Sequence, residues 1–267
     1  MQLAVNILVL AAIYALISCG YVLIYRVSRV LSLAHGELMM LGAYGLYLTA
    51  SLFDGHPLVA VAAALVLAVL VGVAVYLALM WRMTGESVLA AVLATIALGI
   101  LLRGAMILAF GTQTQHPLRD LGWSNASLEL AGARISTVGL TLIVATLAMY
   151  GALFAFLRLS RWGIRMRAAG QHPLLAAQRG IGGKQHAGLE GTLVTIGLKA
   201  FPAALVGGLD SLVGALLGSL AIAAAEVFVI HYVDPLLSEV VPFVVLLAML
   251  IVRPWGLFGT REELDRV

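Results

Sequence analysis

Eight apolar stretches divide this chain, and they constrain its fold more than any other feature. They cover residues 3–25, 30–53, 58–80, 87–110, 135–157, 189–206, 212–231 and 240–252. A helix of about 20 apolar residues spans the ~30 Å hydrocarbon core of a bilayer, and it satisfies its backbone hydrogen bonds internally, as lipid requires. Hydrophobic residues make up 62% of the 267 and charged residues only 11%, which excludes an ordinary soluble domain. The sequence predicts an all-α, polytopic bundle of transmembrane helices with about eight apolar segments.

The chain lacks the residue spacings that enzyme and metal sites need. The single Cys19 rules out a disulfide framework, and the six histidines are scattered without the short spacing of metal ligands. Gly183-Lys184 resembles the end of a phosphate-binding loop, but Gln178 and Gln185 stand where that loop needs a glycine and a serine or threonine. We therefore expect no catalytic residue, no metal and no cofactor in this chain, so that a partner must supply the energy for any active transport.

One segment, from Arg158 to Lys184, is basic although apolar stretches lie on both sides of it. It carries six of the sixteen lysine and arginine residues: Arg158, Arg161, Arg165, Arg167, Arg179 and Lys184. Because lysine and arginine accumulate in cytoplasmic loops of membrane proteins, we place this segment inside. Its alanine and glycine content favours a short helix that binds a partner over a flexible tether.

The other lysine and arginine residues predict the orientation. With the N-terminus outside and the C-terminus in the cytoplasm, twelve of the sixteen lie inside, whereas Arg119 and Arg134 lie outside and Arg103 and Lys199 fall at membrane depth. The number of crossings conflicts with this arrangement, because three full crossings after the basic segment would leave Arg261 outside. Either one late segment is re-entrant, or the number of crossings is unusual.

The second apolar stretch holds two ionisable residues, His35 and Glu37, on either side of Gly36. Ionisable groups at membrane depth are costly and are functional candidates for that reason. Gly36 permits a break in the helix that would expose backbone groups to a pathway. The alternative is a packing role near the inner interface, with Glu37 paired to Arg29.

Glycines mark the late stretches of the chain. Gly214 and Gly218 form a small-x-x-x-small pattern, which lets helix backbones approach closely in lipid, and Gly207 and Gly208 precede it. Packing between helices is the main interpretation, and a glycine-lined pathway wall is the alternative.

Two further charged residues, Lys199 and Glu226, lie within late apolar stretches. Lys199 can extend its ammonium group to the interface, and Glu226 can lie inside a bundle. A pair between them is a third arrangement, and the sequence does not choose among these.

Four segments together resemble one family. The opening LAAIYALISCGYVLIYRVSRVLSLAHGELMMLGAY, with its Ala34-His35-Gly36-Glu37 signature, is similar to the first two spans of permease subunits of branched-chain amino acid ABC importers. SRWGIRMRAAGQHPLLAAQRGI resembles their cytoplasmic coupling loop, GLKAFPAALVGGLDSLVGALLGSLAIAAAEV their glycine-rich late region and VRPWGLFG their C-terminal end. The resemblance runs over nearly the whole length of the chain, and four such segments in this order are specific.

The resemblance implies one permease domain over residues 1–267. Residues 1–157 would form five spans, 158–186 a cytoplasmic coupling loop, 187–253 a shortened membrane region and 254–267 a cytoplasmic tail. It also implies a multi-pass protein of the inner membrane, without bound nucleic acid. Its partners would be ATPase subunits, which bind the ATP, a second related permease or a second copy, and a periplasmic substrate-binding protein.

The resemblance also implies site residues. Those expected along the translocation pathway are His35, Gly36, Glu37, Lys199, Gly207, Gly208 and Gly214. Those expected to couple the chain to the ATPase are Arg165, Arg167, Gly170, Ala176, Ala177 and Gly180. The two arginines would hold the loop at the inner face, and the small residues would keep its docking surface compact.

The chain departs from the family pattern after the coupling loop. Only residues 182–196 stand where that pattern has a full apolar span and an outer loop, about thirty residues more. The missing crossing also accounts for the conflict over Arg261.

Three interpretations therefore stay open at the level of the sequence. The first is the importer subunit, for branched-chain amino acids or for an amide, urea or another small organic solute. The second is a stand-alone channel or secondary transporter that uses His35, Glu37, Lys199 and Glu226 as an ion relay. The third is a shortened relative without transport activity.

Overall fold

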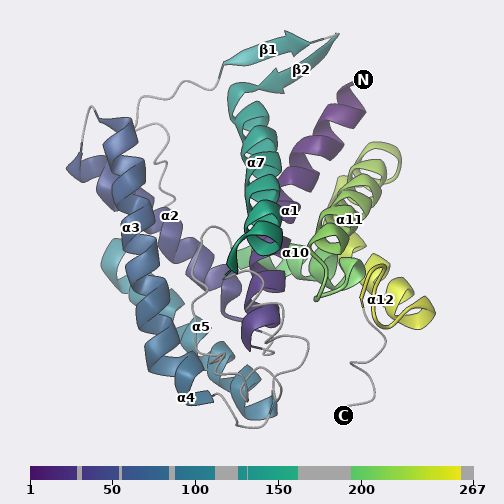
Figure 1. The fold of residues 1–267 in the computed structure, drawn as a ribbon. Helices are drawn as coiled ribbons and strands as arrows, with labels where there is room; N and C mark the ends of the chain where they lie inside the picture. Colours follow the sequence, from purple (N-terminus) through teal and green to yellow (C-terminus); the bar gives the residue numbers. More distant parts are fainter. Residues whose placement is uncertain are drawn as a thin grey trace. The chain divides into compact units, whose positions relative to one another are not determined.

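The computed structural model describes residues 1–28, 32–53, 56–83, 88–111, 126–130, 132–161 and 194–259 (Figure 1). Its elements are, in chain order, α1 (Gln2–Ser28), α2 (His35–Leu52), α3 (Pro57–Val75), the π-helix η1 (Tyr76–Met80), α4 (Trp81–Met83), α5 (Val88–Phe110), β1 (Ser127–Leu130), β2 (Ala133–Ser136), α7 (Thr137–Leu159), α10 (Val194–Gly207), α11 (Leu212–Tyr232), the 3-10 helix η2 (Pro235–Glu239) and α12 (Val241–Val252).

Within these ranges, five helical segments are long and apolar enough to cross a bilayer, which confirms the predicted helical membrane bundle. They are Gln2–Arg26, Pro57–Leu79, Leu89–Phe110, Thr137–Leu159 and Leu212–Tyr232. The apolar stretch 30–53 is not among them: Leu33 and Ala34 form a turn, and α2 begins only at His35. The late helices α10 and α12 have 14 and 12 residues, fewer than the roughly 20 of a full crossing.

A short antiparallel hairpin, β1–β2, which was not predicted from the sequence, precedes α7 in this helical bundle. Ser127 pairs with Ser136, and Leu130 pairs with Ala133 at the closed end. Gly132 sits in the turn with a φ of 77°, a conformation that glycine adopts without steric cost. The hairpin leads directly into α7, where the Ser136 hydroxyl accepts a hydrogen bond from the Gly139 N–H and caps the helix.

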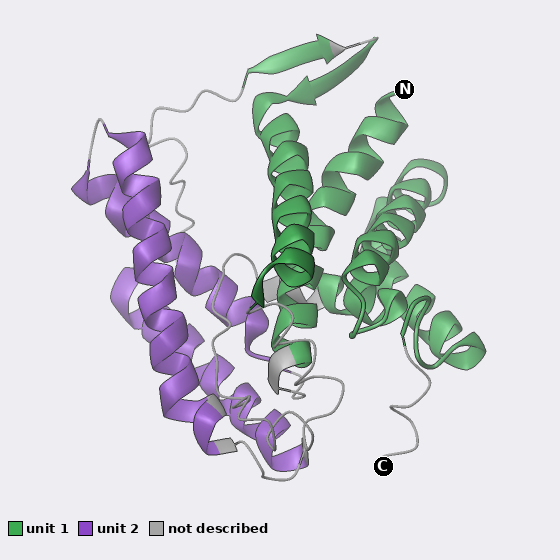
Figure 2. Cartoon of the chain, in the orientation of Figure 1, with its two compact units in different colours: residues 1–27, 125–183, 198–267 green, residues 28–124, 184–197 purple. Residues whose placement is uncertain are grey.

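The chain forms two compact units, coloured separately in Figure 2. Unit 1 consists of residues 1–27, 125–183 and 198–267 and therefore includes α1, the hairpin, α7, α11, α12 and most of α10. Unit 2 consists of residues 28–124 and 184–197 and contains the helices from α2 to α5.

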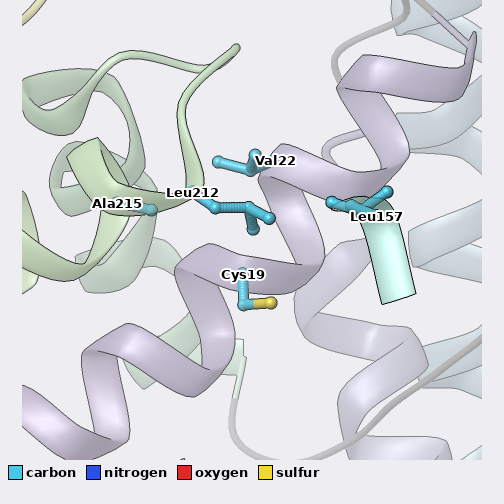
Figure 3. Packing of buried hydrophobic residues seen from close by; sticks show 5 residues of the cluster. All are labelled: Cys19, Val22, Leu157, Leu212 and Ala215. Carbon is cyan, nitrogen blue, oxygen red and sulfur yellow. The ribbon is translucent and has the colours of Figure 1, made fainter. Parts of the chain in front are cut away.

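The core of unit 1 forms around α1. Cys19 and Val22 of α1 pack with Leu157 of α7 and with Leu212 and Ala215 of α11, and all five side chains are buried (Figure 3). Helices in lipid associate through close van der Waals packing and polar contacts between them, because lipid is as apolar as their side chains. Polar contacts supplement the packing here: Thr146 and Tyr150 of α7 donate hydrogen bonds to the carbonyls of Ala12 and Ala15.

One end of unit 1 gathers the end of α1, the turn between α10 and α11, and the C-terminal segment. Arg26 Nε donates a hydrogen bond to the Asp210 carbonyl at 2.8 Å. The backbone N–H groups of Leu257 and Phe258 donate to the carbonyls of Val206 and Gly207 at 2.8 and 3.0 Å. The segment that follows α12 therefore lies at the same end of the unit as Arg26.

The opposite end of unit 1 holds the start of α1 and the hairpin. The Gln2 side chain donates to the Arg134 carbonyl and accepts from the Arg134 N–H. Since Leu157 packs beside Val22, α7 runs from this end back toward Arg26.

The described part of α10 also runs toward the Arg26 end, because Lys199 lies beside Glu226 whereas Gly207 lies beside the C-terminal segment. α11 then leads away from the Arg26 end, and α12 leads back to it. The path from α7 to α10 lies outside the described residues, so the number of crossings stays a prediction.

Unit 2 is built from α2, α3 and α5. A side chain added at Gly45 of α2 would lie 3.3 Å from Leu67 of α3, so the glycine allows these two helices to pack closely. Tyr44 of α2 stacks on Phe110 of α5, with ring centroids 4.6 Å apart. Stacked aromatic pairs of this kind add to the packing between helices.

Candidate functional site

A buried cluster of polar and charged side chains joins three helices of unit 1. Lys199 of α10 donates from Nζ to Glu226 Oε1 of α11 at 3.0 Å. Tyr14 of α1 donates its hydroxyl hydrogen to the other carboxylate oxygen, Oε2, at 2.6 Å. The side chains of Lys199 and Glu226 are 15% and 5% exposed, so Lys199 is the more open member. We call these three residues the Tyr14–Lys199–Glu226 cluster.

The cluster lies well inside the apolar helices. Glu226 stands fourteen residues after the first residue of α11, which is about 21 Å along the helix axis. Tyr14 lies near the middle of the 27-residue α1. Charges at such depth are expensive unless they are paired and hydrogen-bonded. The ion pair and the tyrosine hydroxyl satisfy both carboxylate oxygens of Glu226.

A second polar layer continues the contacts between the same three helices. The Ser18 hydroxyl donates to the Ala200 carbonyl at 3.0 Å, and the Ser219 hydroxyl lies 3.2 Å from the Ser18 hydroxyl. Ser18 follows Tyr14 by one helical turn, so both face the same neighbours. Polar side chains therefore lie in a row along the contact of α1 with α10 and α11.

The glycines predicted for the pathway lie where the backbones of unit 1 meet. A side chain added at Gly207 or Gly214 would collide with the backbone of the other residue, and one at Gly218 would collide with the Ala203 carbonyl. Gly208, with a φ of 103°, lies against Gly259 of the C-terminal segment. These contacts match the packing interpretation, and a role of these glycines in the pathway stays a prediction.

The residues His35, Gly36 and Glu37 lie in the first turn of α2, in unit 2. α2 is continuous from His35, so the helix is not broken at Gly36 and the turn precedes it. His35 is buried, and Glu37 is half-buried at a helix N-terminus, where a negative charge is favourable. The suggested partner of Glu37, Arg29, lies outside the described residues.

Two residues of α5, neither of which was predicted from the sequence, complete the surroundings of this turn. Thr95, which is fully buried, accepts a hydrogen bond from the Leu33 N–H at 3.1 Å. A side chain added at Gly99 would lie 3.2 Å from the Glu37 carboxyl, so this glycine leaves room for the acid. Both positions look like ordinary members of an apolar helix, and only their contacts distinguish them. Tyr14 was missed for the same reason.

The predicted coupling residues are not part of the structural description. Arg165, Arg167, Gly170, Ala176, Ala177 and Gly180 all lie in 162–193, outside the described residues. The described start of this segment holds Arg158, whose guanidinium lies 4.4 Å from the Phe154 ring centroid. This cation–π contact places a positive charge on the last turn of α7.

The structure thus brings together some of the predicted site residues and separates others. Lys199 and the glycines Gly207, Gly208 and Gly214 belong to unit 1, whereas His35, Gly36 and Glu37 belong to unit 2. In the ranges that the structure describes, no three His, Cys, Asp or Glu side chains gather as metal ligands would. The Tyr14–Lys199–Glu226 cluster combines an ion pair with a tyrosine hydrogen bond.

Comparison with known families identifies the class of this protein. The family described as branched-chain amino acid transport system / permease component matches residues 3–186. The chain belongs to this family. The resemblance inferred from the four sequence segments is thereby confirmed, and this permease is a transport component rather than an enzyme.

Individual relatives match over nearly their whole length. The permease is 28% identical to the high-affinity branched-chain amino acid transport system permease protein LivH of Escherichia coli (strain K12), over 100% of this chain and 97% of that protein. It is 27% identical to the corresponding protein BraD of Pseudomonas aeruginosa, over 100% and 98%. A probable LivH of Methanocaldococcus jannaschii is 25% identical over 95% and 89%. No solved structure matches the chain.

The length difference agrees with the predicted loss of about one helix. The alignment with LivH runs over 301 positions, whereas the chain has 267 residues, so at least 34 positions have no counterpart here. A crossing of about 20 residues with a connection fits that number. The family match ends at residue 186, within the segment 182–196 where the sequence departs from the pattern.

Proposed function

We propose that this permease is the membrane-spanning subunit of an ATP-driven importer for branched-chain amino acids or similar small organic solutes. The match to the permease family over residues 3–186 is the observation that carries this proposal. Five helices of membrane-spanning length supply the apolar framework that a pathway requires. The energy would come from ATP bound to separate subunits, because the sequence contains no phosphate-loop motif of its own.

Residues 158–186 would couple the permease to its ATPase. The segment begins at the end of α7, beside Arg158 and Arg161, at the end of unit 1 that also holds Arg26 and Arg253. Four described arginines at one end support a cytoplasmic location for that end. Closure of the ATPase pair would then move helices of the permease as rigid bodies.

The remaining partners follow from the same proposal. A second related permease or a second copy would complete the pathway, and a periplasmic binding protein would deliver the solute. The protein would reside in the inner membrane with its N-terminus outside and its C-terminus in the cytoplasm. The hairpin β1–β2 would then face the outside, since it lies beside Gln2.

The alternative of a stand-alone channel or secondary transporter needs an ion relay. It would use His35, Glu37, Lys199 and Glu226, which the structure divides between two compact units. The ion pair of Lys199 with Glu226 is the one observation in its favour, since paired charges at membrane depth often mark ion pathways. Dependence of transport on ATP distinguishes the two proposals.

The coupling proposal is tested by bulky substitutions in the loop. Ala177→Trp or Gly180→Trp should abolish co-purification with the ATPase subunits, because a large side chain would prevent a compact loop from docking. The measurement is the amount of ATPase retained with the tagged full-length permease. Leu128→Trp on the exposed face of β1 is the control, and it should leave ATPase retention unchanged.

One result would contradict the coupling proposal, and another would contradict the importer proposal. If both loop variants retain the ATPase as well as the native protein does, residues 158–186 are not the docking segment. If the native permease retains no ATPase and transports leucine in energised vesicles depleted of ATP, the ATP-driven importer itself is wrong, and the stand-alone transporter replaces it.

A further inference from the structure

We propose that the Tyr14–Lys199–Glu226 cluster binds the charged backbone groups of a zwitterionic amino acid during its passage. Lys199 would bind the α-carboxylate, Glu226 would bind the α-ammonium group, and Tyr14 would position Glu226. The proposal rests on the transport function above and names the binding site within the permease.

The charges of the cluster are complementary to those of a free amino acid. The Lys199 ammonium group and the Glu226 carboxylate lie 3.0 Å apart, and each neutralises the charge of the other. A zwitterion that enters between them exchanges one ion pair for two, so every charge is paired both before and after binding. The amino acid also recovers part of the hydration energy that its two charged groups lose on leaving water.

The geometry leaves Lys199 able to move while Glu226 stays in place. Glu226 is held by the Tyr14 hydroxyl on Oε2, which continues to satisfy one carboxylate oxygen when Lys199 leaves Oε1. Lys199 is three times as exposed as Glu226 and has a long flexible side chain, so it is the member that can turn toward a ligand. Tyr14 is therefore a positioning residue.

The surroundings strengthen this recognition. Ala203, Ile222 and Ala223, each within one helical turn of Lys199 or Glu226, are fully buried and apolar. Electrostatic attraction between charges is stronger in such an environment than in water. Tyr14 and Glu226 lie within helices of membrane-spanning length and away from their ends, which is where transporter binding sites are commonly found.

A purely structural role explains the cluster less well. α10 and α11 already approach through Gly207, Gly214 and Gly218, whose backbones touch the facing helix. Replacing a buried ion pair by apolar side chains of similar volume is often neutral or stabilising, so packing alone does not require Lys199 or Glu226. Their charge is the property that the packing leaves unexplained.

The test uses the double variant Lys199→Met/Glu226→Met of the full-length permease in lipid nanodiscs, with any subunits that co-purify. The two methionines preserve volume and avoid an unpaired buried charge. Three probes are compared: L-leucine, 4-methylpentanoate, which lacks the ammonium group, and 3-methylbutylamine, which lacks the carboxylate. Binding is measured by equilibrium dialysis with labelled probes, and folding by the thermal unfolding temperature.

We expect the native permease to bind leucine at least about tenfold more tightly than either analogue. The double variant should lose this preference while its unfolding temperature stays within a few degrees of the native value. Tyr14→Phe should weaken leucine binding by about tenfold, because it frees Glu226 from its hydroxyl donor. Tyr150→Phe, which removes a hydrogen bond to a backbone carbonyl only, should leave binding unchanged.

The site is refuted if the folded double variant keeps the native affinity for leucine, or if the native protein binds the two analogues as well as leucine. Either result can occur while ATPase retention and leucine uptake are intact, and the proposed function then stands without this site. Conversely, if leucine binding depends on these charges but the permease retains no ATPase and transports leucine without ATP, the site is supported and the importer proposal is wrong.

Discussion

Two buried or half-buried carboxylates of this permease are accommodated in different ways. Glu226 has the Lys199 ammonium group and the Tyr14 hydroxyl on its two oxygens. Glu37 lies in the first turn of α2, where the helix dipole favours a negative charge, and its carboxyl occupies the space beside Gly99. Gly99 of α5 thus leaves room for the acidic side chain of Glu37 on α2.

The space beside Gly99 can be tested with two matched substitutions on α5. Gly99→Ala and Gly104→Ala both gain the same helix propensity, up to about 1 kcal/mol. At Gly99 the new methyl group would lie 3.2 Å from the Glu37 carboxyl, whereas at Gly104 it would meet nothing within 4 Å. We expect the free energy of unfolding of Gly99→Ala to be about 1–3 kcal/mol lower than that of Gly104→Ala.

The comparison is made by thermal or denaturant unfolding of the two purified variants under identical conditions. Equal stability of both variants would mean that Glu37 moves away from Gly99 at no cost. The packing of α2 against α5 would then not depend on this glycine.

At the scale of elements, the close crossing of α10 with α11 depends on glycines, which have no side chain to keep the helices apart. Gly207 and Gly214 touch through their backbones, and Gly218 faces the Ala203 carbonyl. Such contacts bring two helix axes close enough for van der Waals attraction to hold them in lipid. The same approach brings Lys199 of α10 within reach of Glu226 on α11.

A methyl group at Gly214 should therefore separate the two helices. Because the obstacle is the Gly207 backbone and not a flexible side chain, we expect Gly214→Ala to lower the free energy of unfolding by about 3 kcal/mol. Gly151→Ala on α7 is the control, since its methyl group would meet nothing within 4 Å. Differential scanning fluorimetry of both variants gives the comparison, and a loss at Gly214 no larger than at Gly151 would contradict it.

At the scale of the whole molecule, α11 and α12 decide at which end of unit 1 the described C-terminal segment, up to Gly259, lies. The C-terminal segment is hydrogen-bonded to Val206 and Gly207, at the end that also holds Arg26. The hairpin lies at the opposite end, beside Gln2. The proposed orientation puts the first of these ends in the cytoplasm and the second outside.

Thiol labelling of intact cells tests this orientation. Leu128→Cys on the hairpin should react with a membrane-impermeant maleimide, whereas Phe258→Cys should react only after permeabilisation, because both side chains are exposed but lie at opposite ends. The native Cys19 is buried, so the unmodified protein provides the background signal. Labelling of Phe258→Cys in intact cells would reverse or reject the orientation.

Much of this architecture could be predicted from the sequence alone. The length and hydropathy of the apolar stretches predicted a helical membrane bundle, because a backbone that crosses lipid must form its hydrogen bonds within the protein. The four family segments predicted the permease class, and the early end of the family match agrees with the predicted shortening. The hairpin β1–β2 was not predicted, since its strands of four residues leave little pattern to detect.

The sequence by itself determined the class of this protein, since the hydropathy of a segment and the order of its motifs are local properties. Only the tertiary structure decided that Lys199 pairs with Glu226, 27 positions away, and that Tyr14, 212 positions from Glu226, orients the same carboxylate. Depth and rotation of each helix decide which polar side chains meet. Both depend on how the backbones of α10 and α11 approach at Gly207, Gly214 and Gly218, which is a property of the packed pair and of neither helix alone.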